Sequence, residues 1–378
     1  MTEKLYDLDS HLYKFTASVV SVERKDDYYL TVLDRTAFFP EGGGQASDIG
    51  YIGSAFVDYV FIENDIIYHR TKENITARDI ECAIDSKRRF AFMQNHSGEH
   101  IVSGIINKKY GFDNVGFHLG SDFVTLDFNG ILNREQLDEI EYEANQKIWQ
   151  NVKFKTYYPD KSKLDSLNYR SKKEIGGDIR IVEIEDTDIC ACCAPHVNVA
   201  GEIGIIKLLD FEKLRGGIRI YMKCGEFALA DYRQKYENTL KISALLAAKQ
   251  DNIADAVAAL QNKLTEEKYK ISNLNKKLVD FLISGFDKKG NALFVEDFEI
   301  KELQILADGL HKTYNKTCGA FSKTDEEYNF AICGEENELN EFFSVLKQNL
   351  NIRGGGRNGM VQGAIFADKQ DLEKYFKF

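Results

Sequence analysis

Residues 33–50 read LDRTAFFPEGGGQASDIG, and this stretch decides how the first part of the chain folds. A strand-like run ends at a proline, and three consecutive glycines follow it. Glycine adopts positive φ angles and lets a backbone come close to a neighbour. Gly43 and Gly44 therefore indicate either a tight hairpin turn or a loop that approaches a ligand. Thr36 and Gln45 flank the loop with short polar side chains suited to reading a small ligand.

Short strands are expected on both sides of this loop. Apolar and polar residues alternate there, or β-branched and aromatic residues predominate, as in half-buried strands. The expected strands are residues 18–24, 28–34, 53–62 and 66–71. This pattern predicts a small antiparallel barrel as an N-terminal domain over residues 1–84.

Helices mixed with strands are expected over residues 85–225. A helix at 85–109 should stop near Gly111, and Asn133 should cap a second helix at 133–151. The expected strands are residues 123–128, 179–185, 202–211 and 217–225. Because βαβ units do not alternate regularly, we predict a second domain of α+β type, and an α+β, multidomain chain as a whole.

Residues 226–284 are expected to form a helical stalk. A helix at 227–248 is followed by a break at which Asp251 or Asn252 could cap a new helix. Apolar residues then recur at 4-3 spacing, interrupted only at Glu267: Ile253, Val257, Leu260, Leu264, Ile271, Leu274, Leu278 and Phe281. Such a seam is typical of a coiled coil and predicts a homodimer, with packing of the seam against its own chain as the alternative.

The last predicted domain, residues 285–378, is a glycine-rich α/β domain. Its segment Gly354 to Gly359 matches G-x-G-x-x-G, but the chain ends too soon afterwards for a dinucleotide-binding βαβ unit. We therefore reject a dinucleotide site. A backbone cradle for phosphate remains open, with Arg357 beside it.

Composition limits the classes of function. The first residues lack the apolar core of a signal peptide, and no stretch is apolar enough to span a membrane, so we expect a cytoplasmic protein. Seven cysteines without an export signal argue against a disulfide framework. The net charge of −11 does not favour a nucleic-acid partner, but a local basic face such as Arg215 with Arg219 could still serve one.

Two pairs of residues predict a zinc site. His96 and His100 are four residues apart in an expected helix, so both imidazoles project from one face. Cys192 and His196 form a second pair with the same separation. Three histidines and one cysteine suit Zn²⁺. Cys190 or Cys193 could replace Cys192 as the sulfur ligand.

His96 to His100 also fits the H-x-x-E-H pattern of some zinc peptidases, with Glu99 as the general base. That interpretation leaves Cys192 and His196 without a purpose, so we regard it as the weaker one.

Together these motifs resemble the editing region of alanyl-tRNA synthetases and the free-standing, long-form alanyl-tRNA editing proteins. The family's Leu-Asp-x-Thr-x-Phe-aromatic-Pro motif, followed by Gly-Gly-Gln and Asp-x-Gly, is matched within residues 33–50. Its helix motif is matched by Arg89, Met93, His96 and His100. Its Cys-x-x-x-His-Val motif is matched by Cys192, His196 and Val197, although Cys193-Ala194-Pro195 replaces the usual Gly-Gly-Thr. The helical stalk and Gly354 to Arg357 resemble the C-terminal domain shared with DHH-type phosphoesterases.

The resemblance implies a metal-dependent aminoacyl-tRNA deacylase that hydrolyses Ser-tRNA(Ala), with Gly-tRNA(Ala) as a second substrate. It implies that Thr36 accepts the serine hydroxyl and that Gln45 holds substrate or water. Apart from the resemblance, we predict that the glycine loop, at Gly43 and Gly44, binds substrate and that Arg215, Arg219 and Arg357 contact tRNA.

Four protein ligands form a closed site, whereas activation of water needs an open position on the metal. Zinc could therefore either activate water or position the substrate. A non-catalytic tRNA-binding module with a structural zinc is the alternative function.

Overall fold

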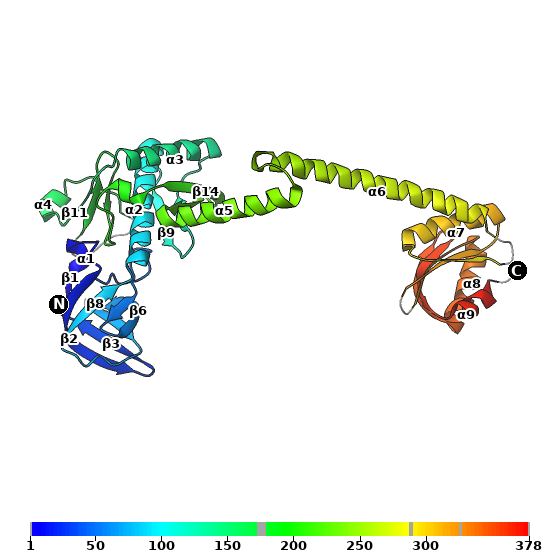
Figure 1. Ribbon diagram of the computed structural model, residues 1–378, viewed down its shortest axis with the longest axis horizontal. Helices are drawn as coiled ribbons and strands as arrows, with labels where there is room; N and C mark the ends of the chain where they lie inside the picture. The colour runs from blue at the N-terminus through cyan, green and yellow to red at the C-terminus, as the bar shows by residue number, and fades with distance from the viewer. Residues whose placement is uncertain (1, 172–178, 287–289, 325–326, 377–378) are drawn as a thin grey trace. The chain divides into compact units, whose positions relative to one another are not determined.

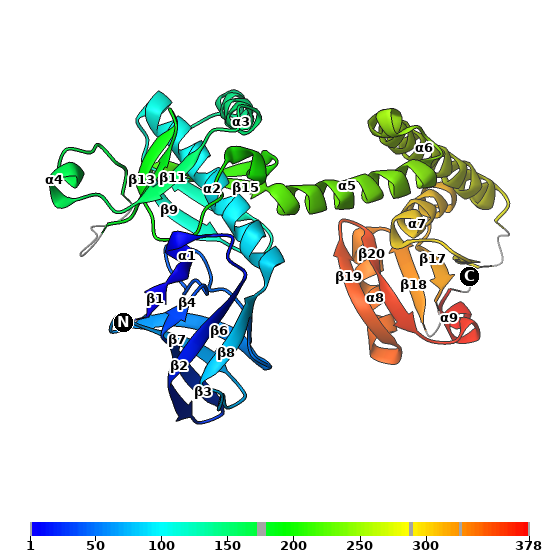
Figure 2. The same cartoon turned by 60° about the vertical axis from the view of Figure 1, so that its left-hand side comes forward.

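The computed structural model describes residues 2–171, 179–286, 290–324 and 327–376. The chain divides into two compact units, Met1–Lys241 and Ile242–Phe378. Each unit contains its own helices and sheets (Figures 1 and 2), so the predicted mixed α+β, multidomain architecture is confirmed. The finer boundaries after residues 84, 225 and 284 stay predictions.

Six strands of the first unit close into a ring in the order β2-β3-β7-β6-β5-β8. Their bounds are β2 Lys14–Lys25, β3 Tyr28–Leu33, β5 Gly50–Ile52, β6 Ala55–Glu63, β7 Ile66–Thr71 and β8 Asp79–Ile84. The strands expected at 18–24, 28–34, 53–62 and 66–71 are confirmed. Side chains such as Ile52, Val57 and Val60 are buried as a shared core, and ring closure leaves none of these six strands with an open edge.

A short N-terminal segment precedes the ring and pairs with a strand next to it. Strand β1 (Glu3–Lys4) pairs in parallel with β4 (Arg35–Thr36), and α1 (Leu5–Leu8) follows it. The glycine loop then forms a tight turn, because the backbones of Gly42 and Gln45 bond to each other. The turn interpretation of this loop is therefore confirmed.

The central helix of the first unit is α2 (Ser86–Tyr110), which matches the helix expected at 85–109. The Asp85 side chain caps its first turn by accepting from the backbone N–H of Arg88, and Gly111 ends it in a left-handed conformation. Every residue from Ala91 to Ile106 is buried. The helix is therefore surrounded by protein on all sides, which is why polar side chains on it must find partners or ligands inside.

Two further sheets and a second helix complete the first unit. The predicted cap at Asn133 is confirmed, and it forms a capping box with Gln136 at the start of α3. The sheet orders are β14-β15-β10-β9 and β11-β12-β13. The bounds are β9 Asn114–Leu119, β10 Val124–Phe128, α3 Arg134–Trp149, β11 Phe154–Tyr157, α4 Lys161–Leu164, β12 Ile181–Ile184, β13 Asp188–Ala191, η1 Ala200–Ile203, β14 Ile206–Leu214, β15 Gly217–Cys224 and α5 Gly225–Leu246.

The second unit packs helices on a five-stranded sheet of order β16-β17-β18-β20-β19. Its bounds are η2 Gln250–Asn252, α6 Ile253–Ser284, β16 Ala292–Val295, α7 Ile300–Tyr314, β17 Cys318–Lys323, β18 Tyr328–Cys333, α8 Glu336–Asn349, β19 Asn351–Arg357, β20 Met360–Phe366 and α9 Lys369–Tyr375. The helices expected at 227–248 and from 253 onward are therefore present as α5 and α6.

Three sequence predictions need correction. The strand expected at 202–211 begins only at Ile206, because η1 and Gly204, with φ of 81°, turn the chain first. Asn252 does stand at the start of α6, but neither it nor Asp251 caps the helix through a side chain, since η2 runs directly into α6.

The third correction concerns the C-terminal domain, where the predicted α/β type would require a mainly parallel sheet. Within this sheet, β16 and β17 form a parallel pair, and the other three described pairs are antiparallel. The segment from Gly354 is part of strand β19 rather than a loop, so the proposed phosphate cradle is not formed there.

No described helix combines the length and the apolar character that crossing a membrane would require.

Candidate metal centre and its cavity

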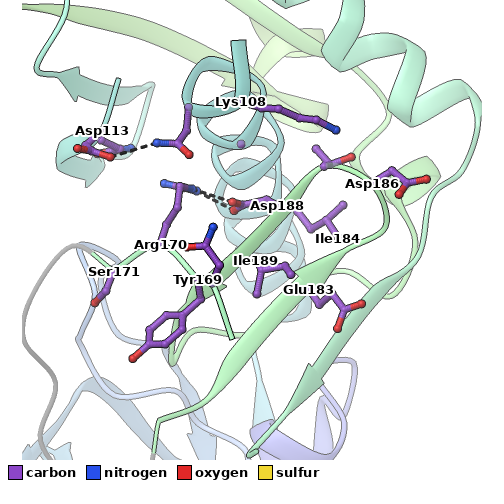
Figure 3. A pocket seen from close by; sticks show the side chains of 15 residues that line it. Lys108, Asp113, Tyr169, Arg170, Ser171, Glu183, Ile184, Asp186, Asp188 and Ile189 are labelled. Carbon is purple, nitrogen blue, oxygen red and sulfur yellow. Dashed lines mark hydrogen bonds and ion pairs between the residues drawn. The ribbon is translucent and has the colours of Figure 1, made fainter. Parts of the chain in front are cut away.

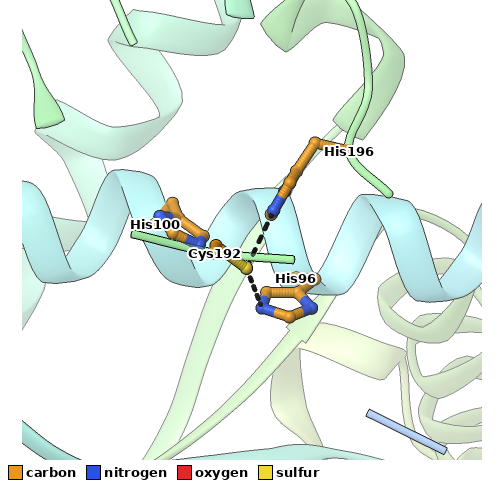
Figure 4. Close-up of side chains that lie close together, drawn as sticks. All are labelled: His96, His100, Cys192 and His196. Carbon is orange, nitrogen blue, oxygen red and sulfur yellow. Dashed lines mark hydrogen bonds between the residues drawn. The ribbon is translucent and has the colours of Figure 1, made fainter. Parts of the chain in front are cut away.

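Four side chains from two distant parts of the sequence meet inside the first unit. The nitrogen or sulfur atoms of His96, His100, Cys192 and His196 all lie within 4.8 Å of one another (Figure 4). The Cys192 sulfur is 3.4 Å from Nε2 of His196 and 3.6 Å from Nε2 of His96. The structure thus brings together all four residues that the sequence predicted as one set.

The secondary structure explains this meeting. His96 and His100 lie one turn apart on the buried stretch of α2, and their rings stack with centroids 5.5 Å apart. Cys192 follows the end of β13, which packs on α2. The chain then turns back, so that His196 approaches the same two rings, at 4.8 and 4.7 Å between centroids.

Each histidine is oriented by a hydrogen bond at its other ring nitrogen. The Nδ1 atom of His96 is 2.8 Å from Oε1 of Gln45, and that of His196 is 3.1 Å from Oγ of Ser97. The Nδ1 atom of His100 is 3.1 Å from Oδ2 of Asp188. A proton on each Nδ1 leaves each Nε2 with its lone pair, as a metal ligand requires.

The protonation states of Cys192 and His196 favour metal binding as well. Burial would raise the pKa of the Cys192 thiol, but the imidazoles of His96 and His196 outweigh burial and hold it well below its usual range. Burial lowers the pKa of His196 to about 3, so this ring is neutral at neutral pH. A thiolate and neutral imidazoles are the forms that ligate metals.

The donor set fits zinc. A nitrogen and a sulfur bound to one Zn²⁺ at tetrahedral angles lie roughly 3.6 Å apart, given bond lengths of about 2.1 and 2.3 Å. The two sulfur–nitrogen distances in the cluster agree with this value. Mixed nitrogen and sulfur donors also suit zinc better than the oxygen-preferring Mg²⁺ or Ca²⁺.

A cavity of about 590 Å³ opens beside the cluster. Its lining includes His96, His100 and Cys192 on one side and the glycine loop on the other. The remaining lining residues are Lys4, Val115, Gly116, Phe117, Tyr158, Arg180, Cys190, Ala191 and Cys193. A cavity of this size can hold a small organic group next to the four donors.

Gly44 must be a glycine for this cavity to exist in its present form. It has a φ of 83°, and a Cβ atom there would lie 2.6 Å from the backbone oxygen of Phe117. Its own carbonyl accepts a hydrogen bond from the N–H of Leu119. The loop is therefore fixed against β9, and both form cavity wall.

Comparison with known proteins agrees with this site. Residues 179–221 match the family described as the threonyl and alanyl tRNA synthetase second additional domain. An alanyl-tRNA editing protein of Pyrococcus horikoshii, AlaX-L, is 28% identical over 98% of this chain and 96% of its own length. The chain is therefore similar to an alanyl-tRNA editing protein over nearly its whole length.

Alanine–tRNA ligases contain a similar region. Those of Thermofilum pendens and Pyrococcus furiosus are 28% and 27% identical over 96% and 99% of this chain. The chain spans only 42% of the length of each ligase. The similarity therefore concerns only one region of each ligase.

Some of the other residues predicted for editing lie beside the four-residue cluster, and others do not. Gly43 and Gly44 line its cavity, and Gln45 contacts His96. Thr36 is fully buried and is not among the cavity-lining residues. Its Oγ1 lies 2.8 Å from Nε2 of His69 and accepts the N–H of Phe38.

The predicted tRNA-binding arginines lie on the surface. Arg215 is exposed in the turn between β14 and β15. Arg219 is half-exposed on β15 and forms ion pairs with Asp127 and Glu212. Arg357 is exposed at the end of β19, in the second unit, and is therefore not part of the metal cluster's unit.

Sequence reasoning missed two residues beside this cluster, Asp188 and Arg180. Asp188 could have been found, because strand alternation places residues 188, 190 and 192 on one face. Arg180 could not. It donates hydrogen bonds to the carbonyls of Cys192 and Ala194, and these contacts with a turn depend on tertiary structure.

Proposed function

We propose that this chain is a trans-editing aminoacyl-tRNA deacylase that removes serine, and also glycine, from wrongly charged tRNA(Ala). The observation that carries the proposal is the cluster of His96, His100, Cys192 and His196 at the wall of a cavity. The similarity of the chain to an alanyl-tRNA editing protein supplies the substrate class.

The reaction is hydrolysis of an ester. Water adds to the carbonyl carbon of the amino acid, and the bond from that carbon to the ribose oxygen breaks. A proton from water ends on the ribose oxygen, so the products are a free amino acid and uncharged tRNA. Because an ester is already activated, orientation and electrostatic stabilisation can supply most of the catalysis.

His96, His100, Cys192 and His196 would hold the zinc ion, which supplies a Lewis acid beside the cavity when bound. The protein's own groups then place the ester. Gly43 and Gly44 carry no side chains and let the 3′ end approach their backbone closely. Lys4 at the cavity supplies positive charge for a phosphate of that end, despite the acidic charge of the whole chain.

Gln45 orients His96, and we propose that it also holds substrate or water. Its Oε1 accepts from His96, whereas no partner for its buried Nε2 is found within the described residues. A buried amide donor without a partner costs free energy, and a carbonyl or water oxygen would satisfy it. The Nε2 group is therefore suited to donate to the ester carbonyl or to the attacking water.

Thr36 is proposed to accept the serine hydroxyl. The Nδ1 atom of His69 faces the carbonyl of Thr31, so Nε2 accepts the Thr36 proton. With Phe38 N–H on one lone pair, the Thr36 oxygen keeps a second lone pair for a serine hydroxyl. Alanine lacks this hydroxyl, so a hydrogen-bonding site can discriminate against it.

Two further proposals concern partners. Arg215, Arg219 and Arg357 are exposed or half-exposed and could bind the phosphates of tRNA. The apolar stripe of α6 is proposed to join two copies of the chain as a coiled-coil dimer. Leu260, Leu264, Leu274 and Phe281 of that stripe are all more than half exposed.

The alternative function is a non-catalytic tRNA-binding module with structural zinc, and the four protein donors are the observation that favours it. Purified chain incubated with Ser-tRNA(Ala), Gly-tRNA(Ala) and Ala-tRNA(Ala) separates the two. We expect rapid release of serine and glycine and little release of alanine. Binding of tRNA without release of any amino acid above background would establish the alternative.

A pair of variants ties the release to the cluster. His100→Ala should abolish release of serine, and so should removal of zinc by a chelator. His311→Ala is the matched control, because His311 lies on α7 in the second unit and hydrogen-bonds to a nearby backbone carbonyl, that of Lys316. Equal loss in both variants would contradict a catalytic role for the cluster.

A further inference from the structure

A carboxylate outside the predicted metal set contacts one of its histidines. Asp188 begins strand β13, and its Oδ2 lies 3.1 Å from Nδ1 of His100. An ionised carboxylate only accepts hydrogen bonds, so Nδ1 must carry the proton. In the neutral ring the other nitrogen, Nε2, then keeps its lone pair for a metal between the four donors.

Asp188 differs from the groups that orient the other two histidines. His96 is held by the neutral amide oxygen of Gln45, and His196 by the neutral hydroxyl of Ser97. Among the described hydrogen bonds of these three Nδ1 atoms, only the one made by His100 has a charged acceptor. A charged acceptor strengthens the hydrogen bond and makes the imidazole a more basic ligand.

Arg170 fixes Asp188 in turn. Its Nε and Nη2 atoms donate to Oδ1 and Oδ2 of Asp188, both at 2.7 Å. The backbone of Arg170 is also bonded to the strand: its N–H donates to the carbonyl of Ile189, and its carbonyl accepts from Ala191. The arginine is thus attached to β13 at three points.

The ion pair is largely enclosed. The side chains of Arg170 and Asp188 are 14% and 2% exposed. The pair contributes to the wall of a second cavity, of about 850 Å³, which Figure 3 shows with the two side chains bonded to each other. An ion pair this buried gains little net stability over apolar packing, so a role in orienting a neighbour is the better explanation for it.

We propose that Asp188, clamped by Arg170, is a positioning residue that orients His100 as a metal ligand. This inference rests on the proposed function, because it requires that the four-residue cluster binds zinc. It adds two residues, which touch neither metal nor substrate, to the group that determines how tightly the ion is held.

The test measures zinc affinity of the full chain rather than activity. In competition with a chromophoric chelator, Asp188→Asn should weaken zinc binding by roughly 10- to 100-fold, as loss of outer-shell partners does elsewhere. Co²⁺ bound in place of zinc should show a shifted visible absorption band in this variant, because the field at His100 changes. A purely structural role for Asp188 would not move that band while the protein stays folded.

Asp58→Asn is the matched control. Asp58 forms the same two-bonded pair with Arg70, at 2.7 and 3.2 Å, but on strands β6 and β7 of the ring. This variant should bind zinc as the unchanged chain does. If both aspartate variants weaken zinc binding equally, a general loss of protein stability causes the effect, and the proposal is wrong.

Arg170→Lys provides a second test should Asp188→Asn fail to fold. Lysine keeps the charge but cannot form the two parallel bonds, so the carboxylate can rotate and zinc affinity should fall by roughly tenfold. Unchanged affinity in either folded variant overturns the positioning role and leaves the proposed function intact. Absence of zinc binding by the unchanged chain would instead overturn the proposed metal site itself.

Discussion

Arg89 and Asp48 form a fully buried ion pair that joins α2, which carries His96 and His100, to the end of the glycine loop. The Nε atom of Arg89 is 3.0 Å from both oxygens of Asp48, and the Nη2 atom also contacts the carboxylate. The two side chains are 0% and 1% exposed. Arg89 additionally donates to the carbonyl of Ser10, and Asp48 accepts the N–H of Phe39.

Removing one member of this pair should strongly destabilise the first unit. Asp48→Asn leaves the Arg89 guanidinium without its counter-charge inside the protein, at a cost of roughly 3–5 kcal/mol in the free energy of unfolding. Urea unfolding followed by circular dichroism measures it. The exposed pair of Arg134 and Asp138 is the control, and Asp138→Asn should cost less than about 0.5 kcal/mol. Comparable losses in the two variants would contradict the importance of burial.

The three neighbouring cysteines should differ in their effect on zinc. Cys192 lies within the four-donor cluster, whereas Cys193 is exposed and Cys190 lies near His100 and Asp188. We therefore expect Cys192→Ser to reduce bound zinc to well below one ion per chain. Cys190→Ser and Cys193→Ser should keep the full amount, as measured by elemental analysis after gel filtration. Loss of zinc in Cys190→Ser alone would reassign the sulfur ligand.

The sequence alone predicts the parts of this site that depend on local structure. Asp85 and Gly111 mark the ends of α2 by side-chain capping and by a left-handed glycine, both local effects. Within that helix the four-residue spacing of His96 and His100 fixes their common face. The separation of Cys192 from His196 likewise permits a chelating turn.

Contacts made across the fold are what the sequence could not predict. Nothing local to Arg170 indicates Asp188 as its partner, and nothing local to Thr36 indicates His69, because tertiary packing of separate strands creates these pairs. The 3₁₀ turn before β14 was missed for a related reason. Ile203 and Ile205 have high strand propensity, but Gly204 between them has a φ of 81° and turns the chain.

Stability should depend on pH through His69. Burial lowers the pKa of this imidazole to about 4, whereas it is 6.5 in the unfolded chain. Between pH 6.5 and 4, His69 is therefore protonated in the unfolded state but neutral in the folded state. The contribution of the neutral His69 to the free energy of unfolding is complete above pH 6.5 and is lost as the pH falls toward 4. The pKa difference corresponds to roughly 3 kcal/mol.

Urea unfolding of the first unit between pH 4.5 and 8 measures this loss. His69→Gln is the control, because glutamine can still hydrogen-bond with Thr36 and Thr31 but does not titrate in this range. The difference in unfolding free energy between the two proteins should shrink as pH falls. A difference that stays constant from pH 8 to 4.5 would show that His69 is not held neutral by the fold.

Thr36→Val tests the proposed reader of the serine hydroxyl. Valine has the same shape but leaves the N–H of Phe38 without its acceptor, which should cost about 1–3 kcal/mol of stability. Loss of a hydrogen bond to serine should lower release from Ser-tRNA(Ala) roughly 5- to 10-fold relative to release from Gly-tRNA(Ala). Single-turnover deacylation of both substrates gives this ratio. Equal slowing of both would mean that Thr36 acts only through His69 and the fold.

The apolar stripe of α6 should hold two copies of the chain together. Its members recur at 4-3 spacing from Ile253 to Phe281, and Leu264 is 55% exposed. Leu264→Lys places a charge in the seam of a coiled coil, so we expect it to convert a dimer to a monomer in light scattering after gel filtration. Asn262→Lys introduces the same side chain two residues earlier, outside the 4-3 pattern, and should leave the mass of the dimer unchanged. A monomeric mass for the unchanged chain at micromolar concentration would refute the dimer, and α6 would then require another partner for its apolar face.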